Sequence, residues 1–161
     1  MSRWTRIVGS LLGVSLAVAA CSSKGPEYPE DHARYKRIDQ AVQSLRDAYS
    51  KKDLSAVTSL LLPGDTNDRV EQDIRKDFQN FEEIKVDFAV DRIVIEGETI
   101  DVFLHWQGQW KRNREEMGIR ERGHGVLRWV GVQSILLQGV EGDLPFGMAA
   151  RQDLGGERRQ S

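Results

Sequence analysis

Hydrophobic side chains recur every three or four residues through the first half of the chain, which is the period of an α-helix with one apolar face. The expected inward positions of the first helix are Tyr35, Ile38, Val42, Leu45 and Tyr49. A short second helix is expected over residues 54–62. Asp53 has the position and chemistry of its N-cap, and Pro63 with Gly64 ends it.

Residues 65–68 offer several possible caps for a third helix, and among them Asp68 fits a capping box with Glu71. Its inward positions are Val70, Ile74, Phe78 and Phe81. After Phe81 the hydrophobic period changes to two residues, which predicts β-strands. The strands are expected over residues 84–94, 100–110, 120–129 and 133–140. Gly108 interrupts the second strand and indicates a bulge or a bend.

Three helices followed by about four antiparallel strands predict an α+β domain, with the helices packed on a curved sheet. The register follows from the need to keep the apolar residues of neighbouring strands on one face. We expect the second and third strands to pair so that Trp106 lies opposite Leu127. The same register places His105 and His124 roughly four residues apart, too far to share a metal ion without a third ligand.

Residues 1–20 have the pattern of a signal peptide. Arg3 and Arg6 form a short basic start, and residues 7–20 are uncharged and end in small side chains. A membrane-spanning helix needs roughly 20 apolar residues, so this stretch is short for a permanent anchor. The only cysteine of the chain, Cys21, follows it directly.

The segment Val18-Ala19-Ala20-Cys21 resembles the lipobox of bacterial lipoproteins. The resemblance implies cleavage before Cys21 and acylation of its sulfur and its amine, which would hold the chain on a lipid bilayer in the cell envelope. Because Ser22 and not an aspartate follows, the resemblance implies, for a host with two membranes, an outer-membrane anchor that faces the periplasm. The alternative is an ordinary secretory signal followed by a chance cysteine.

The expected organisation has four parts: a signal peptide over residues 1–20, a lipidated N-terminus with a flexible linker over 21–32, one domain over 33–148 and a disordered tail over 149–161. The linker combines glycine, proline and mixed charge, and the tail offers no apolar face to bury. A chain of 161 residues is long enough for one domain and short for two.

The order of helices and strands over residues 33–148 resembles the nuclear transport factor 2-like superfamily. The resemblance lies in segment 42–62, where Asp53 opens the second helix, and in the closing strand that leads into residues 142–147, as in lipoprotein members of this group. It implies a cone whose mouth can hold a small molecule. Members include isomerases and dehydratases as well as non-catalytic binders. A different helix-on-sheet α+β fold is the alternative.

Three residues are candidates for a ligand pocket in such a cone. By simple alternation, Arg92 falls on the apolar face of the first strand and could anchor an anion there. Alternatively, its side chain reaches out to solvent, or a bulge turns it to the other face. Asp77 lies beside the apolar face of the third helix, as a base or as a boundary residue paired with a basic group. Trp110 is either a contact at the cone mouth or a core residue.

Net charge, cysteine count and the lack of histidine motifs narrow the range of expected functions. The net charge is −2 and basic residues alternate with acidic ones, so no nucleic-acid partner is expected. A single cysteine and the lack of a histidine motif leave no expected metal site, and no cofactor is expected. We expect a non-catalytic module that binds a small molecule, an envelope protein or a second copy of itself. The alternative is a small-molecule isomerase or dehydratase that uses polar groups inside the cone.

Overall fold

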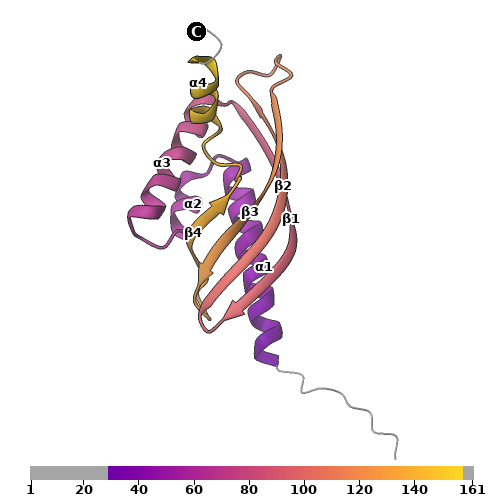
Figure 1. Ribbon diagram of the computed structural model, residues 1–161, viewed down its shortest axis with the longest axis vertical. Helices are drawn as coiled ribbons and strands as arrows, with labels where there is room; N and C mark the ends of the chain where they lie inside the picture. Colours follow the sequence, from indigo (N-terminus) through magenta and orange to yellow (C-terminus); the bar gives the residue numbers. More distant parts are fainter. Residues whose placement is uncertain (1–28, 158–161) are drawn as a thin grey trace, which may run out of the picture.

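The computed structural model describes residues 29–157, and side chains over residues 31–152. The chain has an α+β fold in which three helices precede a curved antiparallel sheet (Figure 1). The elements are α1 (Pro29–Ser50), α2 (Leu54–Leu60), α3 (Asp65–Asn80), β1 (Glu83–Glu96), β2 (Thr99–Lys111), β3 (Ile119–Val130), β4 (Leu136–Gly142) and α4 (Met148–Glu157). The strand order is β1-β2-β3-β4, so each strand pairs with its neighbours in sequence.

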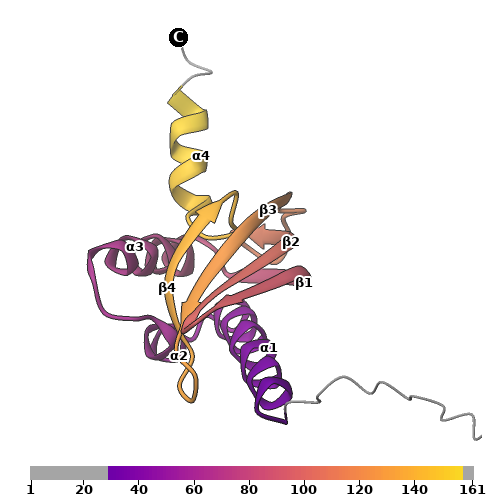
Figure 2. The ribbon, with the colours of Figure 1, turned by 60° about the horizontal axis from the view of Figure 1, so that its bottom comes forward.

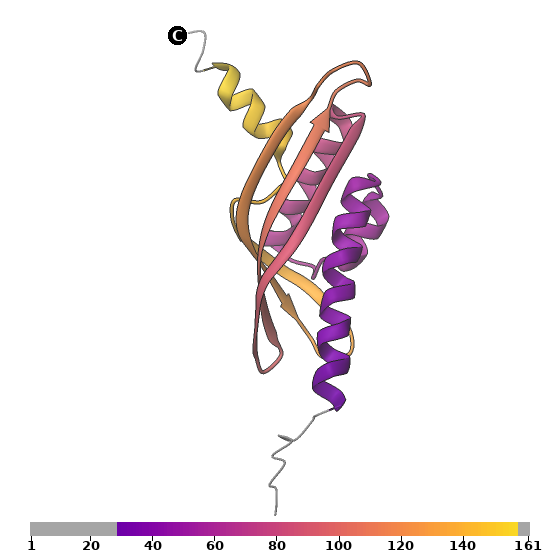
Figure 3. The same ribbon diagram turned by 90° about the vertical axis from the view of Figure 1, so that its right-hand side faces the viewer.

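The helices gather on one face of the sheet and leave the other face open. α1 lies beside β1, and α3 lies behind the strands (Figure 3). α4 projects beyond the sheet and continues away from α1 (Figure 2). The loop between β2 and β3 lies at the end of the molecule opposite the start of α1 (Figure 1). We call the face turned away from α1 and α3 the outer face.

The apolar faces predicted for the helices form one core with the inward residues of the sheet. The largest fully buried side chains are Trp110, Trp129, Tyr49, Phe81, Ile38, Leu45, Ile74, Ile100, Leu104, Leu127, Leu137 and Val42. The inward face of α1 begins at Ile38 and not at Tyr35, which is 46% exposed.

α2 begins where the sequence predicts and ends earlier. The Asp53 carboxylate accepts a hydrogen bond from the Ala56 amide at 3.0 Å, which confirms the predicted cap. The helix ends at Leu60 because the next residue, Leu61, is extended and forms a parallel bridge with Leu137 of β4. The end of α2 is therefore fixed by a contact with the sheet as well as by the proline and glycine that follow.

The capping box predicted for α3 is wrong. The helix begins at Asp65, after Gly64, and no side chain caps its first turn. Asn67 in this turn is buried, and its amide group donates to the carbonyl oxygens of Leu62 and Leu137, at 2.6 and 2.7 Å. The start of α3 is therefore joined to β4 by a side chain that turns into the protein, and Asp68 already lies within the helix.

The alternation of β1 breaks beyond Val90. β1 pairs with β2 in register up to Val90 and again from Arg92, so Asp91 is the extra residue of a β-bulge. The bulge changes which positions face inward. Ile93 lies opposite the buried Val102 and packs against the core, so Arg92 lies on the outer face.

β2 and β3 have the predicted faces but a different register. Trp106 lies opposite Gly123, and Leu127 pairs with Val102 instead. The difference of four residues leaves each side chain on its predicted face, because the side-chain period of a strand is two. The sizes of the paired residues explain the register: a β-carbon at Gly123 would lie 2.9 Å from Cζ2 of Trp106, so the ring fills the space that glycine leaves.

Gly108 serves a similar purpose and marks no bulge. It pairs with Val86 and Glu121 without any shift in register. A β-carbon at this position would lie 2.7 Å from Cζ3 of Trp110. The glycine therefore lets the tryptophan ring pack directly over the backbone of its own strand.

The predicted boundaries of the domain differ from the structure at both ends. Residues 149–157, predicted as a disordered tail, belong to α4, and both Met148 and Ala149 are buried. The buried residues Met148 and Ala149 are adjacent in sequence, so they make no helical period that the sequence would reveal. α1 begins at Pro29, so residues 29–32 are helical and not linker.

The predicted signal peptide, the predicted lipidation site Cys21 and the rest of the predicted linker lie outside the described residues. Within residues 29–157, no helix combines the length and the apolar character needed to cross a bilayer.

Candidate functional site

Asp77 of α3 is a fully buried carboxylate beneath the sheet. Its Oδ2 atom lies 2.7 Å from the Tyr49 hydroxyl and accepts a hydrogen bond from the Gly147 amide at 2.7 Å. Its Oδ1 atom accepts a hydrogen bond from the Ala149 amide, also at 2.7 Å. The carboxylate thus joins α1 to the start of α4, and its partners are a phenol and two backbone amides instead of the basic group that the sequence allowed.

The protonation of this pair follows from its surroundings. Burial raises the pKa of Asp77, and the hydrogen bonds from Ala149, Tyr49 and Gly147 act in the opposite direction. Burial, followed by the nearby Asp77 carboxylate, raises the pKa of Tyr49 well above its usual value. The phenol therefore stays protonated at neutral pH and remains a hydrogen-bond donor.

Trp110 lies in the core and extends the same network. Its side chain has no exposed surface, and its Nε1 atom donates to the Tyr49 hydroxyl at 2.9 Å. Its ring packs edge-to-face on Trp106, with 6.0 Å between the ring centroids. The structure therefore places Trp110 at the core position that the sequence allowed and not at the mouth of a cone.

The space beneath the sheet is filled by side chains. Phe88, Leu104 and Trp106 are each more than nine-tenths buried and belong to the core. Trp106 also donates from Nε1 to the carbonyl oxygen of Asp143 at 2.6 Å, which holds its ring against the segment after β4.

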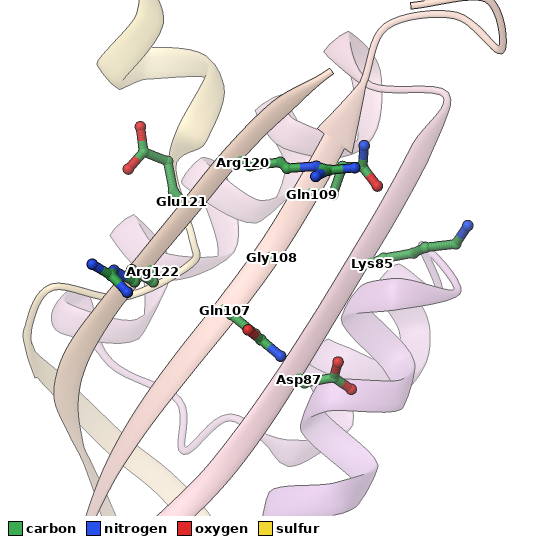
Figure 4. Close-up of a pocket in the computed structure, with 8 residues that line it drawn as sticks. All are labelled: Lys85, Asp87, Gln107, Gly108, Gln109, Arg120, Glu121 and Arg122. Atoms are coloured by element: carbon green, nitrogen blue, oxygen red, sulfur yellow. The ribbon is translucent and has the colours of Figure 1, made fainter. Parts of the chain in front are cut away.

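An open hollow lined mostly by polar residues lies on the other side of the sheet. A groove of about 580 Å³ crosses β1, β2 and β3 on their outer face (Figure 4). We call it the outer-face groove, and its lining residues are Lys85, Asp87, Gln107, Gly108, Gln109, Arg120, Glu121 and Arg122. Its volume lies within the range of small-molecule sites. Asp77 and Tyr49 are not among its lining residues.

A second hollow, of about 610 Å³, continues the outer-face groove along the strands. It shares Asp87, Gln107 and Arg122 with the groove and adds His105 and His124. The two hollows therefore form one continuous surface, which is partly apolar in the second hollow, where Phe88, Ala89 and Trp106 are among the lining residues.

Cross-strand pairing arranges the groove in rows. The first row is Lys85, Gln109 and Arg120, and the second is Asp87, Gln107 and Arg122. Figure 4 shows the Arg120 side chain reaching over β2 towards Gln109, and the Gln107 side chain pointing towards Asp87. Glu121 and Arg122 lie on the side of β3 that is turned away from β2 (Figure 4).

Asp87, Arg120, Glu121 and Arg122 carry charges that no neighbour neutralises. Within residues 31–152, none of the four forms an ion pair or a side-chain hydrogen bond. Other charges of the same sheet are paired, as in Lys85–Glu83, Lys111–Glu83, Arg128–Asp101 and Arg128–Glu141. Hydrogen bonds from the two lysines, first from Lys85, lower the pKa of Glu83. The groove thus combines neutral amides with unpaired charges of both signs.

Arg92 lies outside the groove. Its guanidinium group is centred 4.1 Å from the ring centroid of Phe103, on the outer face. The bulge at Asp91 turns it there, as one of the sequence interpretations allowed. An arginine in this place does not face the core beneath the sheet, where the alternative interpretation put an anion anchor.

The two histidines lie closer together than predicted. His105 pairs directly with His124 across β2 and β3, and their ring centroids are 6.0 Å apart. The predicted separation of four residues is wrong because the register differs by four. Nδ1 of His105 lies 2.7 Å from Oδ1 of Asp91. Among the side chains of residues 31–152, no three of His, Cys, Asp and Glu are grouped so that they could hold a metal ion.

The sequence pattern alone does not reveal the outer-face groove, because the groove depends on which residues face one another across β1, β2 and β3. The signal is present once the register is known. Gln109 lies opposite Arg120 and Gln107 opposite Arg122, where carboxylates would neutralise the arginines. With the predicted register these pairs do not form.

The sequence matches no protein-family profile and no curated protein. Solved structures do match its fold. A nuclear transport factor 2-like superfamily protein from Salmonella enterica superposes with a TM-score of 0.61 at 10% identity, over 71% of this chain and 93% of that chain. A conserved protein from Planctomyces limnophilus gives a TM-score of 0.58 at 16% identity, over 70% of this chain and 99% of that one.

A third similar structure is a candidate dehydratase of the nuclear transport factor 2-like family from Streptomyces avermitilis. Its TM-score is 0.58 at 11% identity, over 69% of this chain and 96% of that chain. Identities this low establish the architecture and carry no activity with them. The helices, the curved four-stranded antiparallel sheet and these superpositions agree that the chain has the nuclear transport factor 2-like fold.

Proposed function

We propose that this chain is a non-catalytic binding module of a bacterial cell envelope, tethered to a bilayer through acylated Cys21, with the outer-face groove as its binding surface. The observation that carries the proposal is the contrast between the two faces of the sheet. One face is packed with buried side chains, and the other has an open groove with unpaired charges.

The chemistry of the packed face supports binding over catalysis. An acid–base enzyme needs an ionisable group within reach of its substrate. Asp77 is ionisable and buried, but both of its oxygens are engaged by Tyr49, Gly147 and Ala149. Its hydrogen bonds to α1 and to the start of α4 give it a structural role, because burying an unpaired carboxylate there would cost folding free energy.

The proposed anchor rests on the sequence. A basic start, an uncharged apolar run, small residues and a unique cysteine occur in the order that acylation requires. Dual or triple acylation of Cys21 would hold the chain on the membrane, whereas one acyl chain would give marginal binding. We propose the outer membrane and the periplasm because Ser22 follows the cysteine.

The place of α1 suits such a tether. α1 starts at one end of the molecule, and the loop between β2 and β3 lies at the opposite end (Figure 1). The row of Lys85, Gln109 and Arg120 is the row of the groove nearer that loop. A chain anchored before α1 would therefore present the groove away from the lipid, to solutes of the surrounding compartment.

An isomerase or dehydratase is the second candidate function. The similar structure described as a candidate dehydratase and the raised pKa of Asp77 favour it. It would require the core around Asp77 to open, because the carboxylate lines neither hollow of the outer face.

The test is to recover what the native protein carries. Small molecules released by denaturing the membrane-derived protein are identified by mass and then incubated with fresh protein. We expect the released compound to rebind and to keep its mass. A compound that fresh protein converts to another mass would contradict the proposal and favour the enzyme.

A further inference from the structure

We infer that the outer-face groove binds a zwitterionic ligand of short-peptide length, with a carboxylate at Arg120 and an ammonium group at Asp87. The inference deepens the proposed binding function and rests on it. Its basis is one arrangement: two unpaired side chains of opposite charge lie in one groove, on different rows, with glutamine side chains beside them.

Arg120 provides the anion site. Its guanidinium group has five N–H donors and no partner among residues 31–152, and its side chain reaches over the groove (Figure 4). Gln109, beside it, uses Nε2 to bind the Met117 carbonyl at 2.6 Å. This bond fixes the glutamine next to the guanidinium. A carboxylate fits the fork of an arginine better than any other common biological group except phosphate.

Asp87 provides the cation site. It lies on β1, one row away from Arg120 along the strands, and the Gln107 side chain points towards it (Figure 4). No lysine or arginine pairs with it in the described part of the chain. A carboxylate next to an amide suits an ammonium group, which needs acceptors on more than one side.

The distance between these sites selects the ligand length. Arg120 reaches over β2, Asp87 lies one strand away, and the two rows are offset by two residues, so strand spacing and rise place the two charges roughly 8–10 Å apart. Three fully extended residues also span about 10 Å. The two charges of an extended tripeptide can therefore reach both sides of the groove, whereas those of a single α-amino acid are too close together.

The other charged residues of the groove do not cancel the positive charge at Arg120 or the negative charge at Asp87. Lys85 is paired with Glu83. Glu121 and Arg122 lie on the side of β3 that is turned away from β2 (Figure 4). Arg122 lines the groove in the row of Asp87 but projects away from β2, so Arg120 is the guanidinium that reaches over the glutamine pair.

Triglycine tests the inference, together with two blocked forms of it. N-acetyl-triglycine keeps only the carboxylate, and triglycine amide keeps only the ammonium group. Calorimetric titration of the full chain should show triglycine binding about tenfold more tightly than either blocked form, because each blocked form loses one charge-assisted contact.

Two variants assign the ends of the ligand. Arg120→Gln should weaken triglycine and N-acetyl-triglycine about tenfold and leave triglycine amide unchanged. Asp87→Asn should weaken triglycine and triglycine amide and leave N-acetyl-triglycine unchanged. Arg112→Gln in the loop after β2 and Glu98→Gln in the turn after β1 make the same charge changes outside the groove, and they should bind all three probes as the native chain does.

Equal affinity for the free and blocked peptides, no heat of binding for triglycine, or equal effects of the groove and control variants would overturn the inference. The proposed binding function fails separately. If the native protein carries a different ligand that the variant with both Arg120→Gln and Asp87→Asn loses, the groove is still the binding site and only the zwitterion is wrong.

Discussion

The Tyr49 hydroxyl lies 2.7 Å from Oδ2 of Asp77, and this contact connects the longest helix of the fold to α3. The same hydroxyl accepts a hydrogen bond from Trp110 on β2, and the same carboxylate holds the amides of Gly147 and Ala149. One buried pair thus joins both helices, the sheet and the start of α4.

Removing the hydroxyl should destabilise the fold. Tyr49→Phe leaves Asp77 and the Trp110 indole each without one buried partner, so we expect a loss of about 1–3 kcal/mol in the free energy of unfolding. Urea denaturation measures the change. Tyr35→Phe is the matched control, because Tyr35 is 46% exposed, and its effect should be near zero. Equal effects of the two substitutions would show that the buried network adds no stability.

The raised pKa of Asp77 predicts how stability depends on pH. The folded chain holds the Asp77 proton more tightly than the unfolded chain does. This group therefore contributes most to the free energy of unfolding at pH values below the ordinary pKa of an aspartate, which is about 4. That contribution is lost as the pH rises through the folded pKa. Asp77→Asn should remove this part of the pH dependence in urea titrations between pH 3 and pH 7. An unchanged slope in the variant would contradict the assignment.

A glycine whose backbone is covered by a tryptophan ring should not tolerate a side chain. Gly108→Ala places a β-carbon 2.7 Å from Cζ3 of Trp110, and we expect a cost of about 1–3 kcal/mol. Gly139→Ala is the control on β4, where the nearest atom would be Cγ2 of Thr66 at 3.9 Å. Thermal unfolding should separate the two variants, and equal melting temperatures would show that Trp110 can move without cost.

The proposed anchor predicts a loss of lipid. Cys21→Ala removes the only thiol of the chain, so the variant should incorporate no labelled palmitate and should become either soluble or an uncleaved precursor. Cell fractionation with palmitate labelling measures both properties. Ser22→Ala, next to the anchor, should still be labelled. Palmitate incorporation in the Cys21→Ala variant would disprove the anchor.

The order of the elements and the core follow from local patterns. The period of α1 identifies Ile38 and Val42 as core residues, and the cap at Asp53 marks the start of α2. These signals depend on neighbours within a few residues, so one sequence contains them. Alternation also assigns Trp106 and Leu127 to the inner face, because the register differs by four residues, an even number that leaves each side chain on its face.

The candidate site depends on long-range contacts, which local patterns do not encode. The register of β2 and β3 is set by the Trp106 ring over Gly123, a size match that alternation does not detect. Without that register, the pairs Gln109–Arg120 and His105–His124 are not visible. α4 is missed for a related reason, since its start is held by Asp77, which lies far away along the chain.

The central claim is that the outer-face groove is the binding surface of this domain. Native mass spectrometry of the full chain, released from its own membranes, tests it most directly when the wild type is compared with the variant carrying both Arg120→Gln and Asp87→Asn. We predict a small-molecule adduct on the wild type and its loss from the variant, with the folded charge-state distribution unchanged. An adduct that persists on the folded variant, or its absence from the wild type, would contradict the account.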